Sequence, residues 1–264
     1  MRESQACSVL VSSCDAYSDL WTPFFTLFWR YWPDCPHPVN LGANQAQYDD
    51  PRVRTLKAGR DESWSKNLRF FLNQIDSEYV LLLLEDFFFT GRVSTAAVSK
   101  QIDILRCLNG TVLRLFPNPP PETRLNGYPS LGSIHRLAPF RVSAQAAIWK
   151  RAGLLGLLRD EENAWEFERN GTARTRDRAD GFYCTYRPIL PYVHVVEQGR
   201  WFWRAARRFR QANIGCNFGA RPVIPARTAA KKAVRSLMQG IGNRIRGLRL
   251  RTQTRGAPCC GSHS

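Results

Sequence analysis

The sequence has 264 residues, of which 44% are hydrophobic and 12% aromatic, enough for one large domain with a sizeable core. This composition excludes a chain that is disordered throughout. The longest apolar run, residues 80–84, is much shorter than the roughly 20 residues that cross a bilayer, and no signal-peptide pattern opens the chain. We therefore expect a cytoplasmic protein, and eight cysteines without a CxxC pair fit reduced thiols.

The formal net charge of +16 is concentrated at the C-terminal end of the chain. From Arg200 onward there are 15 Lys or Arg residues and no Asp or Glu, which leaves 23 basic and 22 acidic residues before that point. The charge pattern therefore predicts a nearly neutral body with a basic tail, and it argues against a nucleic-acid-binding fold.

Strand-like and helix-like segments alternate over the first half of the chain. Residues 8–12 form a short β-favouring run typical of a buried first strand, and residues 19–32 place Leu20, Phe24 and Phe28 at helical spacing. The same reading gives strands at 39–41, 79–84 and 112–116 and helices at 63–75 and 95–108. This order predicts an α/β fold with a Rossmann-like, mostly parallel central sheet flanked by helices.

The second half of the chain is less regular. We expect a Pro-rich loop at 117–129, a pair of strands at 134–142, a helix at 144–158, and strands at 183–186 and 192–196. Residues 1–214 are then one domain, residues 215–227 a linker containing Gly and Pro, and residues 228–264 a basic tail.

The tail contains an apolar stripe at helical spacing, formed by Val234, Leu237, Met238, Ile241, Ile245 and Leu248. Lys and Arg residues flank this stripe. Such a basic amphipathic helix can lie in the headgroup layer of an anionic membrane, so we expect a peripheral position on the inner face of the membrane. The alternative is a helix that packs on the body of the protein.

Polar residues follow the predicted first strand, where ligands bind in open α/β sheets. Asp15 can accept hydrogen bonds from a nucleotide, Tyr17 can stack on its base, and Ser13 belongs to the same cluster. The alternative is a turn in which Asp15 caps the next helix.

A second polar cluster, Glu85 and Asp86, follows the apolar run of residues 80–84 directly. Two carboxylates in so apolar a setting are costly to bury without a partner. A divalent cation, Mn²⁺ or Mg²⁺, bridging to a diphosphate is a natural partner for them. A salt bridge to Arg or a helix N-cap would satisfy them as well.

Residues 165–168 alternate aromatic and acidic side chains. In an extended loop Glu166 and Glu168 point the same way, and aromatic faces such as Trp165 stack on sugars. We expect Glu168, or else Glu166, to act as the general base that deprotonates an acceptor hydroxyl. The alternative is an amphipathic strand with solvated carboxylates.

Short motifs in this order resemble the GT-A glycosyltransferases of bacterial capsule and lipopolysaccharide synthesis. The matching motifs are VSSCD at 11–15, SWS at 63–65, LLEDF at 83–87, VSAQ at 142–145 and AWEFE at 164–168. The resemblance covers about residues 8–201. One departure is that the acidic motif is Glu-Asp and not Asp-x-Asp.

The resemblance implies a role for each motif. It implies that Asp15 contacts the nucleotide, that Trp64 and Ser65 shape the donor side, and that Asp86 holds the metal or the diphosphate. His194 would complete the metal site. The alternative is a histidine in the core or at the surface that makes ordinary hydrogen bonds and binds no metal. The sugar and acceptor pocket would be lined by Ser143, Gln145, Trp149 and Trp165.

The sequence therefore predicts a glycosyltransferase of hexosyltransferase type. It would move a sugar from a nucleotide-diphosphate donor to a polysaccharide, lipopolysaccharide or lipid-linked acceptor, without a specific nucleic-acid partner. The alternatives are a nucleic-acid- or membrane-binding protein that uses the Arg-rich tail, an inactive GT-A-like scaffold, and a nucleotidyltransferase. The chain has neither a GxxxxGK[ST] nor a GxGxxG phosphate loop to favour the last of these.

Overall fold

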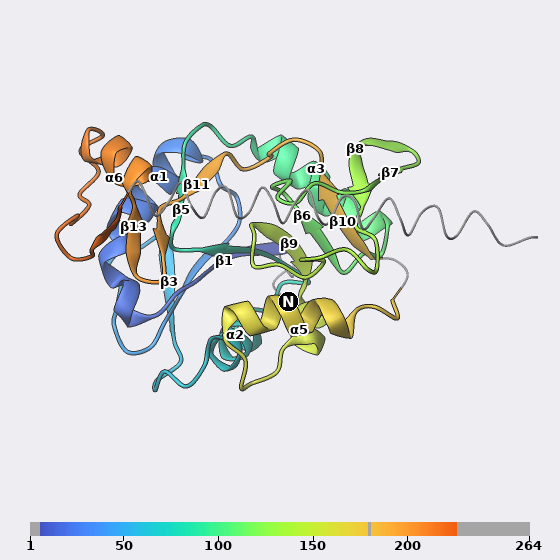
Figure 1. The fold of residues 1–264 in the computed structure, drawn as a ribbon, viewed down its shortest axis with the longest axis horizontal. Helices are drawn as coiled ribbons and strands as arrows, with labels where there is room; N and C mark the ends of the chain where they lie inside the picture. Colours follow the sequence, from blue (N-terminus) through green and yellow to red (C-terminus); the bar gives the residue numbers. More distant parts are fainter. Residues whose placement is uncertain (1–5, 179–180, 226–264) are drawn as a thin grey trace, which may run out of the picture.

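The computed structural model describes residues 6–178 and 181–225. A nine-stranded sheet in the order β3-β2-β1-β4-β9-β6-β10-β8-β7 runs through its centre (Figure 1). These strands are β1 (Cys7–Ser12), β2 (Val39–Ala43), β3 (Val53–Lys57), β4 (Tyr79–Leu84), β6 (Val112–Arg114), β7 (Thr123–Leu125), β8 (Tyr128–Ser133), β9 (Ala147–Lys150) and β10 (Phe182–Thr185).

The sheet changes character across its width. Strands β3, β2, β1 and β4 are parallel to one another. Beyond them, β9 runs antiparallel between β4 and β6, β10 is parallel to β6, and the β7–β8 hairpin closes the edge in antiparallel pairing. The predicted α/β fold is confirmed, with a parallel first half and a mixed second half.

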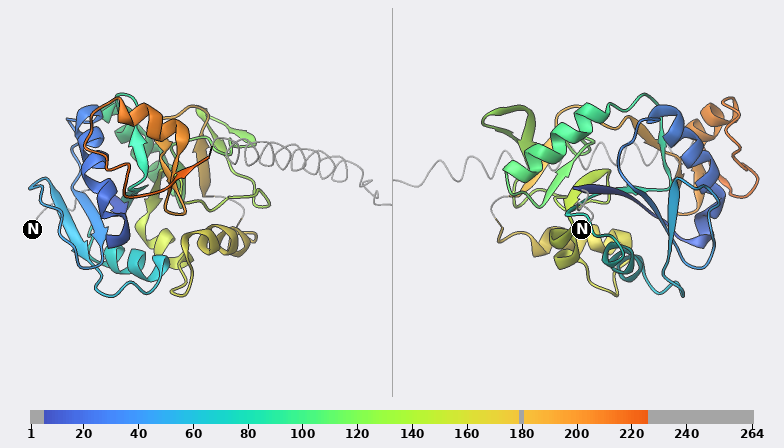
Figure 2. Two further views of the ribbon diagram at one scale, coloured as in Figure 1. Left: turned by 60° about the vertical axis from the view of Figure 1, so that its left-hand side comes forward. Right: turned by 180° about the vertical axis from the view of Figure 1, so that it is seen from behind.

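Helices cover both faces of the sheet (Figures 1 and 2). Helices α1 (Trp21–Tyr31) and α3 (Thr95–Cys107) lie on one face, and α2 (Trp64–Asn73), α4 (Arg151–Leu157) and α5 (Ala164–Arg174) lie on the other. Strand β4 is apolar throughout because it feeds both layers: Leu81 and Leu83 pack in the core on the α1 and α3 side, and Val80 and Leu82 in the core on the opposite side.

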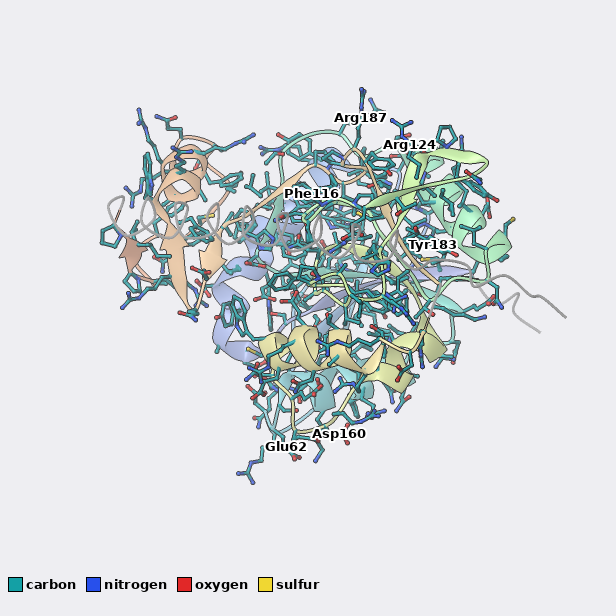
Figure 3. The ribbon with its side chains drawn as sticks, turned by 45° about the vertical axis from the view of Figure 1, so that its right-hand side comes forward. Glu62, Phe116, Arg124, Asp160, Tyr183 and Arg187 are labelled. Carbon is teal, nitrogen blue, oxygen red and sulfur yellow. The ribbon has the colours of Figure 1, made fainter. Side chains whose placement is uncertain are left out.

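Side-chain caps fix where the helices begin. Ser63 accepts a hydrogen bond from the amide of Lys66 at 3.0 Å at the start of α2, and Ser94 caps α3 in the same way. Figure 3 labels Glu62 and Asp160 at the edge where α2 meets the connection between α4 and α5. There Ser63 Oγ also donates to the carbonyl oxygen of Asp160, so one side chain starts α2 and ties it to the neighbouring layer.

The remaining elements gather over the carboxyl ends of β1 and β4. A 3₁₀ helix, η1 (Asp15–Leu20), follows β1 directly, and a short strand, β5 (Phe87–Phe89), follows β4 after a two-residue turn. Strand β11 (Tyr192–His194) pairs antiparallel with β5. Beside it lie β12 (Val196–Glu197), β13 (Arg200–Phe202), α6 (Trp203–Arg210) and β14 (Val223–Ile224).

Three sequence expectations for the second half are corrected. The single helix expected at 144–158 is split into β9 and α4, because an apolar strand buried on both faces has the composition of a buried helix. Residues 134–142 form no strand, and Arg114 Nη1 donates to the carbonyl of Phe140 in this irregular segment. Residues 117–129 contain β7 and the start of β8. Their side chains are mostly exposed, so the sequence lacks the hydrophobic alternation that would have predicted strands.

The segment expected to be a linker, residues 215–227, packs against the domain as far as it is described. Strand β14 extends the β12–β13 sheet, and Arg221 reaches Asp19 in η1. The expected tail helix lies outside the described residues. Among the helices of residues 6–178 and 181–225, none is both long and apolar enough to cross a bilayer.

Candidate functional site

A cavity of about 540 Å³ lies at the carboxyl ends of β1 and β4, where ligands bind in open α/β sheets. Its walls come from η1, the start of α2, the turn after β4, the loop before β9, the start of α5 and the segment from β11 to β13. Nine of the residues expected from the sequence line it: Ser13, Tyr17, Trp64, Glu85, Asp86, Gln145, Trp165, Glu168 and His194.

Asp86 and His194 both line the cavity and lie next to each other. Asp86 lies in the turn between β4 and β5, and His194 ends β11, which pairs with β5. This pairing brings Asp86 Oδ2 to 3.6 Å from His194 Nδ1. Asp86 Oδ1 is buried and has no hydrogen-bond partner among the described residues. Because a buried carboxylate oxygen without a partner is costly, this atom marks a place for a ligand.

Glu85 is also buried and sits beside Asp86. Desolvation by burial, and then the negative charge of Asp86, raise the pKa of Glu85 to about 8. A hydrogen bond with Ser13 and the positive charge of Arg221 act in the opposite direction and lower this pKa. The Ser13 hydroxyl accepts a hydrogen bond from Trp21 Nε1 at 2.8 Å, so the buried indole holds Ser13 against the Glu85 carboxyl group.

Asp15 does not line the cavity. Its carboxylate instead accepts hydrogen bonds at 2.8–3.0 Å from the amides of Asn44, Gln45 and Ala46, which follow β2. Partial desolvation raises the pKa of Asp15, but these three donors outweigh it and hold the pKa below its usual value. Asp15 therefore ties the loop after β2 to the end of β1, and Cys14 occupies the N-cap position of η1.

Three further expected residues lie behind the cavity wall. Ser65 and Trp149 are completely buried. Trp149 belongs to β9, and its indole packs toward the core of the α2, α4 and α5 layer, with its ring 6.4 Å from that of Phe167. Ser143 does not line the cavity either, and its hydroxyl donates to Glu168 Oε1 at 2.9 Å.

Residues 165–168 form the first turn of α5 and not an extended loop, so the two acidic side chains diverge. Glu166 closes a capping box with Asn163 and does not line the cavity. Glu168 lines the cavity, and its Oε1 accepts from Ser143 Oγ and from the amide of Ala144 at 2.8 Å. Its other oxygen, Oε2, has no partner in the described part of the chain.

Apart from His194, the ionisable side chains of the described cavity wall are mainly carboxylic acids. The cavity walls contain five carboxylates, Asp61, Glu85, Asp86, Glu168 and Glu197. Among the described residues, no Lys or Arg lines it, although the whole chain has 38 of them. Arg221 lies nearby but donates to both carboxylate oxygens of Asp19 and places its guanidinium 4.2 Å from the ring centre of Tyr17.

Several wall residues were not expected from the sequence. Asp61 accepts from Asn67 Nδ2 at 2.7 Å, and Phe202 comes from β13. Tyr192, also not expected, does not line the cavity; it is buried beside His194 and donates to Gln145 Oε1. The strand pattern offers a signal for Tyr192, since it lies two residues from His194 and therefore on the same face. Asp61 and Phe202 carry no comparable signal.

Comparisons with known proteins give similarity in fold only. No protein-family model matches the chain, and no curated protein sequence matches it. S. aureus TarS (residues 1–349) in complex with UDP-GlcNAc aligns with a TM-score of 0.44 and 12% identity over 68% of this chain and 58% of TarS. The aligned part thus spans less than two thirds of that structure.

Two enzymes align over more of their length. Galactosyltransferase LgtC, in complex with donor and acceptor sugar analogues, aligns with a TM-score of 0.44 and 9% identity over 85% of this chain and 99% of LgtC. A cytidylyltransferase from Leptospira borgpetersenii aligns with a TM-score of 0.44 and 9% identity over 80% of this chain and 97% of the enzyme. Sequence identity this low assigns no family.

Proposed function

We propose that this protein is a cation-dependent glycosyltransferase that moves a sugar from a nucleotide-diphosphate donor to a glycan acceptor. The observation that carries the proposal is the buried, unpartnered Oδ1 of Asp86, beside His194, in a cavity at the carboxyl ends of the parallel strands. The GT-A resemblance of the sequence motifs supports the same reading. The acceptor would be a polysaccharide, a lipopolysaccharide or a lipid-linked sugar.

The charge of the cavity supports a divalent cation. A nucleoside diphosphate is an anion, and the ionised carboxylates of the wall, without a Lys or Arg among the described wall residues, would repel it. Asp86 and His194 offer a carboxylate and an imidazole, a donor set that suits Mn²⁺, and Asp86 also suits Mg²⁺. When bound, the cation would neutralise the diphosphate as it leaves. In the described residues, no group of three or more His, Cys, Asp or Glu side chains is arranged to hold an ion, so the proposed site rests on Asp86 and His194.

The donor side of the cavity would be formed by Tyr17, Ser13 and Trp64. Tyr17 and Ser13 are anchored at the end of β1, and Trp64 packs with its ring 5.2 Å from that of Phe167. A flat aromatic ring gives a stacking surface for a base or a sugar. Glu85, kept largely protonated by its raised pKa at neutral pH, would not add a second full charge beside Asp86.

Glu168 is the residue we propose as the general base. Its Oε1 is held by two donors from the loop before β9, and Oε2 remains for the proton of an acceptor hydroxyl. The acceptor oxygen would attack the anomeric carbon of the donor sugar, its proton would pass to Glu168, and the bond to the diphosphate would break. Trp165, at the cavity edge with 59% of its surface exposed, would stack on the acceptor.

We propose that the basic C-terminal end brings the enzyme to an anionic membrane that carries its acceptor. The exposed face of α6 supports this, since it presents Arg204, Arg207, Arg208 and Arg210. Clusters of arginine near a surface bind anionic lipids in a salt-dependent way. Binding to vesicles with anionic lipid should fall when the residues after 226 are removed, and equal binding by the truncated protein would contradict the proposal.

Thermal stabilisation by a panel of nucleoside diphosphates, with and without Mn²⁺, tests the donor site. A ligand at 100 times its Kd stabilises the fold by about 2.7 kcal/mol. We expect a cation-dependent increase in Tm with one nucleotide that is lost in Asp86→Asn. The matched control is Asp61→Asn, which removes another carboxylate of the same cavity and should keep the increase. No increase with any nucleotide would contradict the proposal.

A further inference from the structure

Four side chains from three elements form a continuous chain that ends at the proposed cation site. Tyr192 and His194 come from β11, Gln145 from the loop before β9, and Asp86 from the turn after β4. The Tyr192 hydroxyl donates to Gln145 Oε1. His194 Nε2 lies 3.4 Å from the same oxygen and 3.3 Å from Gln145 Nε2, and His194 Nδ1 lies 3.6 Å from Asp86 Oδ2.

The direction of the first hydrogen bond is fixed by the backbone. The amide of Ala146 donates to the Tyr192 hydroxyl oxygen at 3.4 Å, which leaves the hydroxyl hydrogen for Gln145. Tyr192 is buried, and its ring stacks on Phe87 at 4.4 Å between centres, so the hydroxyl group is held in place. The carboxamide of Gln145 is therefore oriented with Oε1 toward Tyr192, and both its Oε1 and its Nε2 are within reach of His194 Nε2.

Gln145 can meet His194 Nε2 in two ways: its Nε2 donates to an unprotonated ring nitrogen, or its Oε1 accepts from a hydrogen on that nitrogen. A cation at His194 Nδ1 requires the second arrangement, because the first leaves the ring hydrogen on Nδ1. An amide oxygen has two lone pairs, so Gln145 Oε1 can accept from Tyr192 and from a hydrogen on His194 Nε2 together. With its hydrogen on Nε2, His194 presents the lone pair of Nδ1 toward Asp86. Phe87 packs against the same ring at 4.5 Å and 69°, which limits rotation of the imidazole.

We infer that Gln145 is a positioning residue that sets His194, through its Nε2, to bind a divalent cation together with Asp86; the inference rests on the cation site of the proposed function. Gln145 then acts through His194 and not as the hydroxyl partner of the acceptor. Tyr192 supports the same orientation from behind. Histidines that bind metals commonly use the other ring nitrogen in this way, and loss of such a partner typically weakens metal affinity by about 10- to 100-fold.

Mn²⁺ binding to the full-length protein without nucleotide, followed by electron paramagnetic resonance of the free ion, tests the inference. We expect Gln145→Leu to bind Mn²⁺ about 10- to 100-fold more weakly than the wild type. Gln145→Glu keeps an acceptor for both hydrogens and should retain the affinity. Tyr192→Phe removes a hydroxyl that cannot touch the ion, and it should still weaken binding. The matched control is Gln198→Leu, the same change at another glutamine of the cavity wall, which should bind as the wild type does.

The outcomes separate this inference from the proposed function. If the wild type binds Mn²⁺ and Asp86→Asn does not, but Gln145→Leu binds as tightly as the wild type, Gln145 does not position His194 and the inference is overturned. If Gln145→Glu weakens Mn²⁺ binding as much as Gln145→Leu does, the inference is overturned too. The loss of affinity would then result from any substitution at this position and not from loss of the hydrogen-bond acceptor. If the wild type binds no Mn²⁺, the cation site of the proposed function falls as well.

Discussion

At the scale of single residues, the two carboxylate oxygens of Glu168 have different interactions. Oε1 holds the loop before β9 through Ser143 and Ala144. In the proposed function, Oε2 would take the proton of the acceptor hydroxyl. A substitution that keeps the first task and removes the second can therefore separate structure from chemistry.

Glu168→Gln is that substitution, since its amide oxygen still accepts from Ser143 and Ala144. We expect the rate of sugar transfer to fall by about 10²- to 10⁴-fold, the usual contribution of a general base. Tm and donor binding should stay close to those of the wild type. Glu166→Gln, two residues away in the capping box, is the control and should keep its transfer rate. A Glu168→Gln variant with full activity would assign the base elsewhere.

Glu85 gives a prediction in which the effect depends on pH. Burial and Asp86 raise its pKa to about 8 in the folded protein, against roughly 4.3 in the unfolded chain. Between these values the folded state binds the proton and the unfolded state has lost it, so the free energy of unfolding falls as pH rises.

Glu85→Gln should therefore be more stable than the wild type at pH 8, by on the order of 1 kcal/mol or more, with the difference shrinking toward pH 4. Urea denaturation of both proteins at several pH values measures this. A difference that is constant with pH would show that Glu85 is ionised in the folded protein.

Nine residues singled out from the sequence line the cavity, but the contacts around them could not be predicted. Glu85 and Asp86 could be placed because a continuous apolar strand ends directly before them. Asp15 follows β1 as expected, yet its carboxylate is turned to the loop after β2, a contact between residues about 30 positions apart that no local pattern encodes. The pairing of β11 with β5 places Tyr192 beside Phe87 and Gln145, and this pairing is not visible in the local sequence.

At the scale of elements, the close approach of β2 and α2 depends on one glycine. A Cβ atom at Gly42 would lie 2.3 Å from Cε2 of Phe71, which is completely buried. Strand β2 can therefore pack under α2 only without a side chain at this position.

Gly42→Ala should lower the free energy of unfolding by about 1–3 kcal/mol, the cost of overpacking a core. Gly156→Ala is the control, because an added Cβ there meets nothing within 4 Å. That change lies in α4 and should stabilise the protein by up to about 1 kcal/mol, since alanine favours a helix over glycine. Urea midpoints that fall equally for both variants would contradict the packing of β2 on α2.

The elements also show where the sequence pattern was sufficient. Helices α1, α2 and α3 were predicted within a few residues because each has one apolar face and α2 and α3 have a serine cap. Strand β9 was not predicted. Its residues Ala147, Ile148 and Trp149 are buried on both faces of the sheet and lack the hydrophobic alternation of a half-exposed strand. Its place between β4 and β6 is decided by pairing over long distances in the chain.

At the scale of the whole molecule, the C-terminal part of the described chain contacts the segment that follows β1. Arg221 donates to both oxygens of Asp19 and to the carbonyl of Ala16, and it covers Tyr17 at the cavity. Both members of this pair are more than three quarters buried. The contact joins residues about 200 positions apart and places an arginine beside an acidic cavity.

A double-mutant cycle with Arg221→Ala and Asp19→Ala should give a coupling energy of about 1–3 kcal/mol, as expected for a paired contact away from solvent. The exposed pair Arg106 and Asp103 in α3 is the control, and its coupling should be within about 0.5 kcal/mol. Additive effects at Arg221 and Asp19 would mean that the C-terminal segment does not hold η1 in place.

The proposed function requires that Asp86 hold a cation which enables release of a nucleoside diphosphate from a sugar donor. The most direct measurement is the amount of nucleoside diphosphate released from a panel of nucleotide sugars, with Mn²⁺ or with EDTA, by the wild type and by Asp86→Asn. We expect release from one donor, dependent on Mn²⁺ and abolished in Asp86→Asn. Equal release by Asp86→Asn, or no release from any nucleotide sugar, would contradict it.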